Sequence, residues 1–202
     1  MIRVLLADDE ELIRTALAAL VSLEADLEVV AQAGDGRAAV EEALAHRPDV
    51  AVVDLQMPRL DGVGVAAEIS RALPTCAVII LTGYGKPSML KRALDAGAKG
   101  FLPKGSPGGQ LADVIRRVHR GSRYVDPAMA ADALTAPPCP LTPRELEVLR
   151  LAELDTPVAV IARRTHLSPG TVRNHLSAIV TKLGAAGRAD AARIAVDNGW
   201  LP

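Results

Sequence analysis

The first 122 residues alternate short β-type runs with longer helical patterns, and this alternation constrains the fold more than any other feature. The β-type runs are rich in β-branched residues and bounded by turn residues; they read IRVLLA, LEVVAQAG, DVAVVD, CAVIILTG and KGFLPK. The segments between them carry apolar residues at helical spacing. Strands that alternate with helices form a parallel sheet with helices on both faces. We therefore predict an α/β domain with a doubly wound, five-stranded parallel sheet.

The rest of the chain follows a different pattern. Residues 123–139 contain a short Ala-rich stretch, compatible with one helix, and the pair Pro137-Pro138; we interpret them as a linker. From Pro140 on, four short helical segments follow one another. The first opens with Thr142-Pro143-Arg144-Glu145, a capping box, and Ser168 caps the third. Residues 140–202 therefore predict a compact all-α domain that contains a helix-turn-helix.

The composition excludes several classes of protein. No apolar run approaches the roughly 20 residues of a membrane span, and the start, MIRVLLADDEE, does not resemble a signal peptide. The two cysteines, Cys76 and Cys139, have no CxxC spacing and read as isolated thiols. We expect a soluble cytoplasmic protein that does not act at a membrane.

Charge is distributed unevenly along a chain whose formal net charge is −1. Residues 1–139 carry 15 Lys and Arg against 18 Asp and Glu, whereas residues 140–202 carry 8 against 6. Positions 156–189 contain five basic residues and no acid. This local excess of positive charge indicates that one face of the C-terminal domain meets a polyanion.

An acid ends the most apolar of the β-type runs, where Val52 and Val53 lead directly into Asp54. An ionised carboxylate is very unfavourable inside an apolar core unless it has a partner, so we expect Asp54 at the mouth of the sheet. The carboxyl ends of parallel strands converge on one edge. Other polar residues follow the other strands and should meet Asp54 there; they are Asp8, Asp9, Thr82 and Lys104.

These residue types together suit phosphoryl chemistry. Three carboxylates in one cleft repel each other unless a cation lies among them, and hard oxygen ligands suit Mg²⁺. Lys104 supplies a further positive charge and Thr82 a hydroxyl donor, and an Asp carboxylate can attack a phosphoryl group. We predict that Asp54 accepts a phosphoryl group. Taken singly, the same residues have ordinary explanations as a helix cap, a surface lysine and a β-forming threonine.

The order of an acidic pair, D-x-x-M-P, a threonine and a lysine resembles a CheY-like receiver domain, over residues 1–122. That resemblance implies the strand order 2-1-3-4-5, with Pro103 on the edge strand. It implies that Asp9, Asp54 and the backbone carbonyl of Gln56 bind Mg²⁺ directly, and that Asp8 acts through water.

The same resemblance assigns a conformational switch. It implies that the Thr82 hydroxyl moves toward the phosphate with Lys104, and that the ring of Phe101 reorients with it, although Phe101 also suits simple core filling. Gln56 and Tyr84 occupy the positions that tune phosphate lifetime in the family.

Residues 140–202 resemble the LuxR/FixJ-type DNA-binding domain, through LTPRELEVLRL, IARRTHLSPGTVRNHLSAIVTKLG and RADAARIA. The phrases LTPRELEVL and GTVRNHLS are most similar to the desaturase-control (DesR-like) branch of the NarL/FixJ family. The chain departs from the family at Asp155, where a helix-ending glycine is usual. The last helical segment resembles the family's dimerising helix, and a two-fold dimer would match paired half-sites in DNA.

The third helical segment should present one face to a DNA major groove. Its apolar residues recur at helical spacing and should pack inward; they are Val172, Leu176, Ile179, Val180 and Leu183. We expect Arg173 and Asn174 to read bases, with Ser177 on the same face. Phosphate contacts, which position a protein without reading sequence, are expected from Thr171, Lys182 and Arg164.

The two resemblances together predict a non-enzyme: a transcriptional response regulator of a two-component system. A sensor histidine kinase would phosphorylate Asp54, and the phosphorylated homodimer would bind double-stranded promoter DNA. The receiver would catalyse only its own phosphoryl transfer and dephosphorylation.

Three alternative functions share features with this sequence. A phosphohydrolase would need a second acid two residues after its nucleophile, and Gln56 occupies that position. A flavodoxin-like FMN carrier would need hydroxyls and glycines in its first loop, where this chain has Asp8, Asp9 and two glutamates. The third is a phosphorylation-independent DNA-binding regulator whose receiver serves only as a dimerising scaffold.

Overall fold

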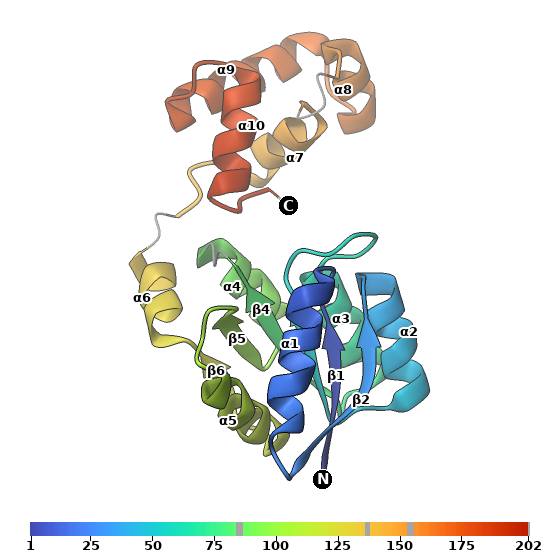
Figure 1. The fold of residues 1–202 in the computed structure, drawn as a ribbon. Coiled ribbons are helices and arrows are strands. Elements are labelled where there is room, and N and C mark those ends of the chain that lie inside the picture. Colours follow the sequence, from blue (N-terminus) through green and yellow to red (C-terminus); the bar gives the residue numbers. More distant parts are fainter. Residues whose placement is uncertain (84–86, 136–137, 153–155, 202) are drawn as a thin grey trace. The chain divides into compact units, whose positions relative to one another are not determined.

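The structure is a computed structural model, and it describes residues 1–202 apart from 84–86, 136–137, 153–155 and 202. The chain divides into two compact units between Leu134 and Thr135 (Figure 1). The first is α/β and the second all-α, as predicted. None of the helices in the described part combines the length and the apolar character that a membrane span requires.

All strands of the first unit pair in parallel in one sheet, in the order β2-β1-β3-β4-β5-β6. Their bounds are β1 Ile2–Ala7, β2 Leu27–Ala33, β3 Val50–Asp54, β4 Ala77–Thr82, β5 Gly100–Pro103 and β6 Tyr124–Val125. The expected order of the first five strands is confirmed. The sixth strand was not predicted, because two residues are too few to show a period of two.

The added strand changes the environment of Pro103, which was expected on an edge strand. β6 pairs with Gly100 and Phe101, so this part of β5 is internal. Pro103 lies past that pairing. The Lys104 amide donates to the Thr82 carbonyl oxygen of β4 at 2.8 Å, so the Pro103 nitrogen faces the opposite, open side. A residue without an N–H is tolerated there because no ladder hydrogen bond is lost.

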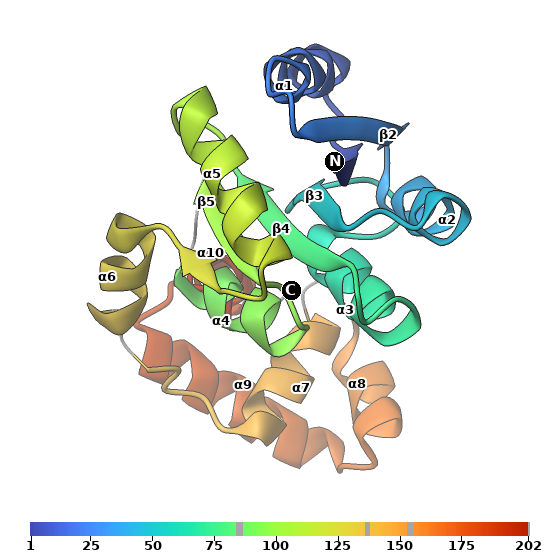
Figure 2. The same cartoon turned by 90° about the horizontal axis from the view of Figure 1, so that it is seen from below.

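Helices cover both faces of the sheet (Figure 2). α1 and α5 pack over one face, and α2, α3 and α4 pack over the other. Their bounds are α1 Glu11–Ser22, α2 Gly36–His46, α3 Gly62–Ala72, α4 Pro87–Asp95 and α5 Gly108–His119. The strands between these layers are buried on both sides, as continuous apolar runs such as VAVVD require. The sheet is therefore a fixed platform for the side chains at its carboxyl edge.

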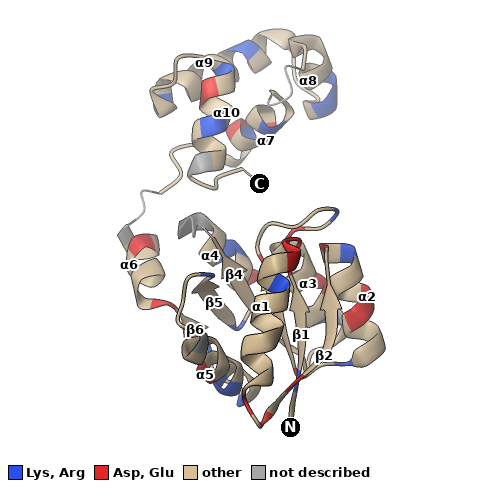
Figure 3. Cartoon of the chain, in the orientation of Figure 1, with Lys and Arg blue, Asp and Glu red and all other residues tan. Residues whose placement is uncertain are grey.

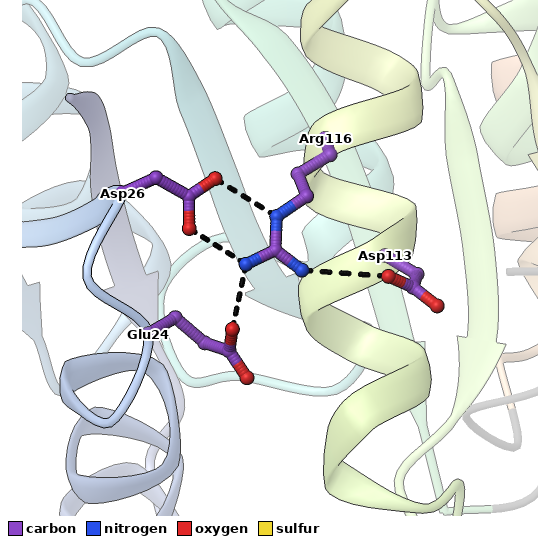
Figure 4. A network of polar contacts seen from close by, with 4 residues as sticks. All are labelled: Glu24, Asp26, Asp113 and Arg116. Atoms are coloured by element: carbon purple, nitrogen blue, oxygen red, sulfur yellow. Dashed lines mark hydrogen bonds and ion pairs between the residues drawn. The ribbon is translucent and has the colours of Figure 1, made fainter.

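An ion-pair network ties α5 to the connection between α1 and β2 (Figure 4). The Arg116 guanidinium lies 2.6 Å from both Glu24 and Asp26 and 3.4 Å from Asp113. Its hydrogen bonds lower the pKa of Asp26 to about 2. Because the network is solvent-accessible, its contribution to stability is modest; it fixes how α5 lies beside α1.

Part of the predicted linker is attached to the first unit. β6 is followed by α6 (Pro127–Thr135), which is the expected short Ala-rich helix. Asp126 caps α6 by accepting hydrogen bonds from the amides of Ala128 and Met129. Met129 and Ala133 then pack against the apolar cluster of α2, α3 and α4. The linker proper is consequently shorter than residues 123–139.

The described residues of the second unit form the four predicted helices: α7 Pro143–Ala152, α8 Val158–Thr165, α9 Pro169–Leu183 and α10 Arg188–Asp197. The expected capping box is present, since the Thr142 amide donates to Glu145 at 2.7 Å and the Glu145 amide donates to the Thr142 hydroxyl at 3.2 Å. The Ser168 hydroxyl accepts the Thr171 amide and caps α9. The apolar residues of α9 that were expected to face inward join one core with α7, α8 and α10.

Candidate functional site

Four strands bring the predicted polar residues to the carboxyl edge of the sheet. Asp8 and Asp9 follow β1, Asp54 ends β3, Thr82 ends β4 and Lys104 follows β5. One carboxylate oxygen from each of the three aspartates lies within 4.8 Å of the other two. This geometry brings the three aspartates together, as the sequence predicted.

Lys104 is the electrostatic centre of the cluster. Its Nζ lies 2.8 Å from Asp8 Oδ2, 3.3 Å from Asp54 Oδ2 and 3.3 Å from Glu10 Oε1. Asp8 and Asp54 are buried, with 1% and 5% of their surface exposed, whereas Asp9 is exposed. The cluster therefore has a buried floor and an open acidic rim.

Burial raises the pKa of Asp54 to about 6. The ammonium of Lys104 acts in the opposite direction, and the negative charge of Asp8 adds to the effect of burial. The attraction of both carboxylates raises the pKa of Lys104, against the opposing effect of its own burial. Near neutral pH the site therefore holds an ionised but poorly solvated Asp54 beside a charged lysine.

This shift makes a prediction for the cation-free protein. The folded-state pKa of Asp54 exceeds the ordinary value of about 4, so the free energy of unfolding falls as pH rises from about 4 to about 6, by about 3 kcal/mol. Asp54→Asn should therefore melt higher than the wild type at pH 7 in chelator, and the difference should shrink as the pH is lowered through about 6. Thermal unfolding at pH 7 and pH 5 measures this, and a variant less stable than wild type at pH 7 would contradict it.

The donor set suits a hard divalent cation. Asp8 Oδ2 is buried and lies 2.8 Å from the Lys104 ammonium, and no other group in the described part of the chain donates a hydrogen bond to it. The exposed Asp9 and Gln56 flank the cluster where solvent can enter. Carboxylates and carbonyl oxygens are the ligands such ions take. The residues present could thus bind a metal ion.

The backbone at Asp54 and Leu55 packs closely against β4 and against the first residue of α3. The amide of Leu55 donates to Leu81 and the amide of Gly62 donates to Leu55, at 2.8 and 2.9 Å. A Cβ atom at Gly62 would lie 2.3 Å from the Asp54 carbonyl oxygen. The first residue of α3 is therefore packed directly against the end of β3, an approach that only glycine permits.

The start of α2 braces the loop after Asp54, which the sequence alone did not indicate. The Gly36 amide donates to the Pro58 carbonyl at 3.3 Å, and a Cβ at Gly36 would lie 1.9 Å from the Leu60 carbonyl oxygen. Arg59, in the left-handed region with φ 67°, forms an ion pair with Asp35. Gly36 is the one sequence feature that could have indicated a close backbone contact, but the sequence does not show that its partner is the loop of Pro58 and Leu60.

The residues expected to switch are buried. Thr82 is 2% exposed at the end of β4, and Phe101 is 0% exposed on β5, opposite Ile80. The ring of Phe101 belongs to the cluster that α4 and α6 cover. Tyr84 lies outside the described residues.

The second unit exposes the residues expected to meet DNA. α8 and α9 form the predicted helix-turn-helix, and Figure 3 shows basic residues on both. Arg173, Asn174 and Ser177 are exposed on α9, and Arg163 and Arg164 are both exposed at the end of α8. Asp155 lies outside the described residues.

Two of the expected phosphate contacts have protein partners. Thr171 Oγ1 lies 2.8 Å from the Ser168 hydroxyl. Lys182 Nζ donates to both carboxylate oxygens of Glu145, each at 2.8 Å. Sequence spacing did not indicate the second pair, because its members are 37 residues apart.

Comparison with known proteins matches both halves. Residues 4–116 match the response regulator receiver domain, and residues 139–195 match the luxR family of bacterial regulatory proteins. The chain is 40% identical to the uncharacterized transcriptional regulatory protein YvfU of Bacillus subtilis and 38% identical to the transcriptional regulatory protein DesR of the same organism. Each alignment spans 201 residues and 100% of both chains.

A solved structure of the same organisation is also similar. The crystal structure of the response regulator ChrA, from a heme-sensing two-component system, superposes with a TM-score of 0.60 at 32% identity. The match covers 99% of this chain and 98% of that chain. Together with the acidic cluster of the first unit and the helix-turn-helix of the second, these matches show that the chain belongs to the NarL/FixJ family of two-component response regulators, non-enzymatic transcriptional regulators that join a receiver to a LuxR-type DNA-binding domain.

Proposed function

We propose that a sensor histidine kinase transfers a phosphoryl group to Asp54, and that the phosphorylated chain forms a homodimer that binds promoter DNA in the cytoplasm. The observation that carries this proposal is the placement of Asp54. Its carboxylate ends β3 at the open edge of the sheet, 3.3 Å from the Lys104 ammonium and beside two further aspartates. A carboxylate in this setting serves as a nucleophile rather than as a structural cap.

On the receiver side, the transfer uses two groups that already form an ion pair, Asp54 and Lys104. An Asp54 carboxylate oxygen attacks the phosphorus, the bond from phosphorus to the kinase histidine nitrogen breaks, and that nitrogen leaves with the electron pair. Lys104 lies where its ammonium can stabilise the oxygens of the transferring group. Because the pKa of Asp54 is about 6, the nucleophile is ionised at neutral pH.

Mg²⁺ would be held by Asp9, Asp54 and the backbone carbonyl of Gln56, with Asp8 acting through water. The bound ion would neutralise charge that develops on the phosphoryl oxygens. The support for this assignment is the meeting of three carboxylates, one of which, Asp8, has a buried oxygen with no partner besides Lys104 in the described part of the chain.

Removal of divalent cations is expected to stop phosphoryl uptake from a small acyl phosphate, because the carboxylates would then repel the incoming anion. Asp9→Asn should raise the Mg²⁺ concentration needed for uptake by at least about tenfold. Intact-protein mass spectrometry at stepped Mg²⁺ concentrations measures both effects. Glu41→Gln, an exposed change on α2, is the matched control; uptake that persists undiminished in chelator would contradict the cation assignment.

Thr82, Lys104 and Phe101 are proposed to carry the switch. Thr82 and Phe101 lie on neighbouring strands and are both buried, so a hydroxyl drawn toward the phosphate would free space near the ring. A phosphate can shift this equilibrium only by contacting one arrangement better than the other. The Thr82 hydroxyl and the Lys104 ammonium are the groups that would make those contacts.

At DNA, Arg173 and Asn174 are proposed to read bases, with Ser177 beside them, while Arg164 and Thr171 contact phosphates. The support is the exposure of Arg164 on α8 and of Arg173, Asn174 and Ser177 on α9, away from the apolar residues that pack into the core; Thr171 is half-buried in the first turn of α9. Arg suits guanine and Asn suits adenine in bidentate geometry.

Arg173→Ala and Arg164→Ala should weaken DNA binding in different ways. Loss of a base contact costs about 1–3 kcal/mol at the preferred site and relaxes specificity, whereas loss of a phosphate contact weakens all sequences alike and lowers the salt slope by about 1. Sites selected from a random pool, followed by anisotropy titrations on selected and mixed-sequence duplexes, separate the two. Equal losses on both duplexes for Arg173→Ala would remove it from base reading.

A further inference from the structure

The first turn of α7 contains a carboxylate whose position DNA recognition does not explain. Glu145 is only 5% exposed, and both of its oxygens accept hydrogen bonds from Lys182 of α9. One of them also accepts the Thr142 amide. Glu145 therefore joins its own helix cap to the C-terminal end of the helix that presents Arg173 and Asn174.

The neighbouring residue makes a second link from the same turn. The Arg144 guanidinium donates to the carbonyl oxygen of Thr165, the last residue of α8. Thr165 is 1% exposed, and its hydroxyl donates back to Ile161 at 2.8 Å. The first turn of α7 thus contacts the ends of both helices of the helix-turn-helix.

The charges argue against a second role for Lys182 at the phosphate backbone. Its ammonium faces a carboxylate through two hydrogen bonds, so the pair has no net charge with which to attract a polyanion. A phosphate brought to Lys182 would also approach Glu145 and be repelled by it. Arg164, by contrast, is an exposed cation at the end of α8.

We propose that Lys182 is a positioning residue: its pairing with Glu145 fixes the recognition helix α9 against α7, and it makes no contact with a DNA phosphate. The inference rests on DNA binding by the second unit and revises one residue of the contact set expected from the sequence. It also assigns a role to Glu145, which no sequence pattern beyond the helix cap had indicated.

Glu145→Gln distinguishes a positioning role of Lys182 from a phosphate contact, because the two roles predict opposite changes in DNA affinity. Glutamine can still accept the Thr142 amide, because a capping box takes Gln as well as Glu, so the variant loses the ion pair and keeps the cap. If Lys182 bound phosphate, removal of the competing carboxylate would tighten DNA binding. The positioning role instead predicts that affinity falls about tenfold, the scale on which one charge-assisted hydrogen bond shifts an equilibrium.

The salt dependence of binding provides a second readout. The full chain, with Mg²⁺ and beryllofluoride as phosphoryl mimic, is titrated with a fluorescent mixed-sequence duplex at several salt concentrations. A phosphate contact contributes about 0.9 to the slope of log affinity against log salt. Arg164→Ala should lose that amount, whereas Lys182→Met should weaken binding at every salt concentration and leave the slope unchanged.

A double variant tests whether the two residues act as one pair, and thermal unfolding controls for misfolding. Glu145→Gln and Lys182→Met disrupt the same pair, so the combined variant should bind DNA no more weakly than the weaker single variant. Thermal unfolding verifies that each variant is folded at the assay temperature. A lower slope for Lys182→Met, or tighter binding by Glu145→Gln, would overturn the proposal. An error in the proposed phosphate contacts appears separately, as an unchanged slope for Arg164→Ala.

Discussion

Asp54→Asn is expected to abolish phosphoryl uptake by the first unit, the largest effect that any single substitution should have on its chemistry. The amide has no ionisable oxygen to attack phosphorus. The other buried carboxylate of the cluster, Asp8, is paired with Lys104 at 2.8 Å. We expect the rate to fall by more than about a hundredfold, to the background of non-specific acylation.

The measurement is the mass gained by the intact protein with an acyl phosphate and Mg²⁺. The matched control is Asp61→Asn in the loop after Asp54. Its carboxylate caps α3 through the Gly64 amide at 2.7 Å, and asparagine caps about equally well. Uptake should survive in the control. Phosphorylation of Asp54→Asn at the wild-type rate would place the acceptor at another residue.

Gly62→Ala is expected to destabilise the first unit by about 3 kcal/mol, as a steric clash with rigid backbone does. The added Cβ would lie 2.3 Å from the Asp54 carbonyl oxygen and 3.0 Å from the Leu55 Cα. Both atoms belong to backbone at the end of β3, so either α3 or Asp54 must move. Phosphoryl uptake should fall together with stability.

Gly109→Ala is the control for this prediction. Gly109 lies in α5, and a Cβ there would meet nothing within 4 Å. Because alanine favours a helix by up to about 1 kcal/mol over glycine, this variant should be as stable as wild type or more so. Chemical denaturation measures both variants, and equal stability of the two would show that the end of β3 yields to the added methyl group.

Much of the fold was predictable because its signals are local. Apolar runs such as VAVVD, separated by amphipathic segments, specify strands and helices one by one. The parallel connection then determines that Asp8, Asp54 and Lys104 share an edge. β6 was missed because Tyr124 and Val125 gain their strand geometry only from pairing with β5.

The features that sequence could not reveal are pairings between distant residues. The spacing Asp8-Asp9 does not say which carboxylate is buried; the structure buries Asp8 and exposes Asp9. The sequence predicted Lys182 as a phosphate contact, and its spacing could not reveal the hydrogen bond to Glu145, which lies 37 residues earlier. The role of an ionisable side chain depends on the groups around it, and tertiary structure determines which groups those are.

Sedimentation of the full chain with Mg²⁺, with and without beryllofluoride, beside Asp54→Asn, would show whether Asp54 is the switch. Beryllofluoride mimics the aspartyl phosphate. It is expected to convert the wild type from monomer to dimer and to leave Asp54→Asn unchanged. The same oligomeric state in all four samples would contradict the switch at Asp54 and favour a receiver that serves only as a scaffold.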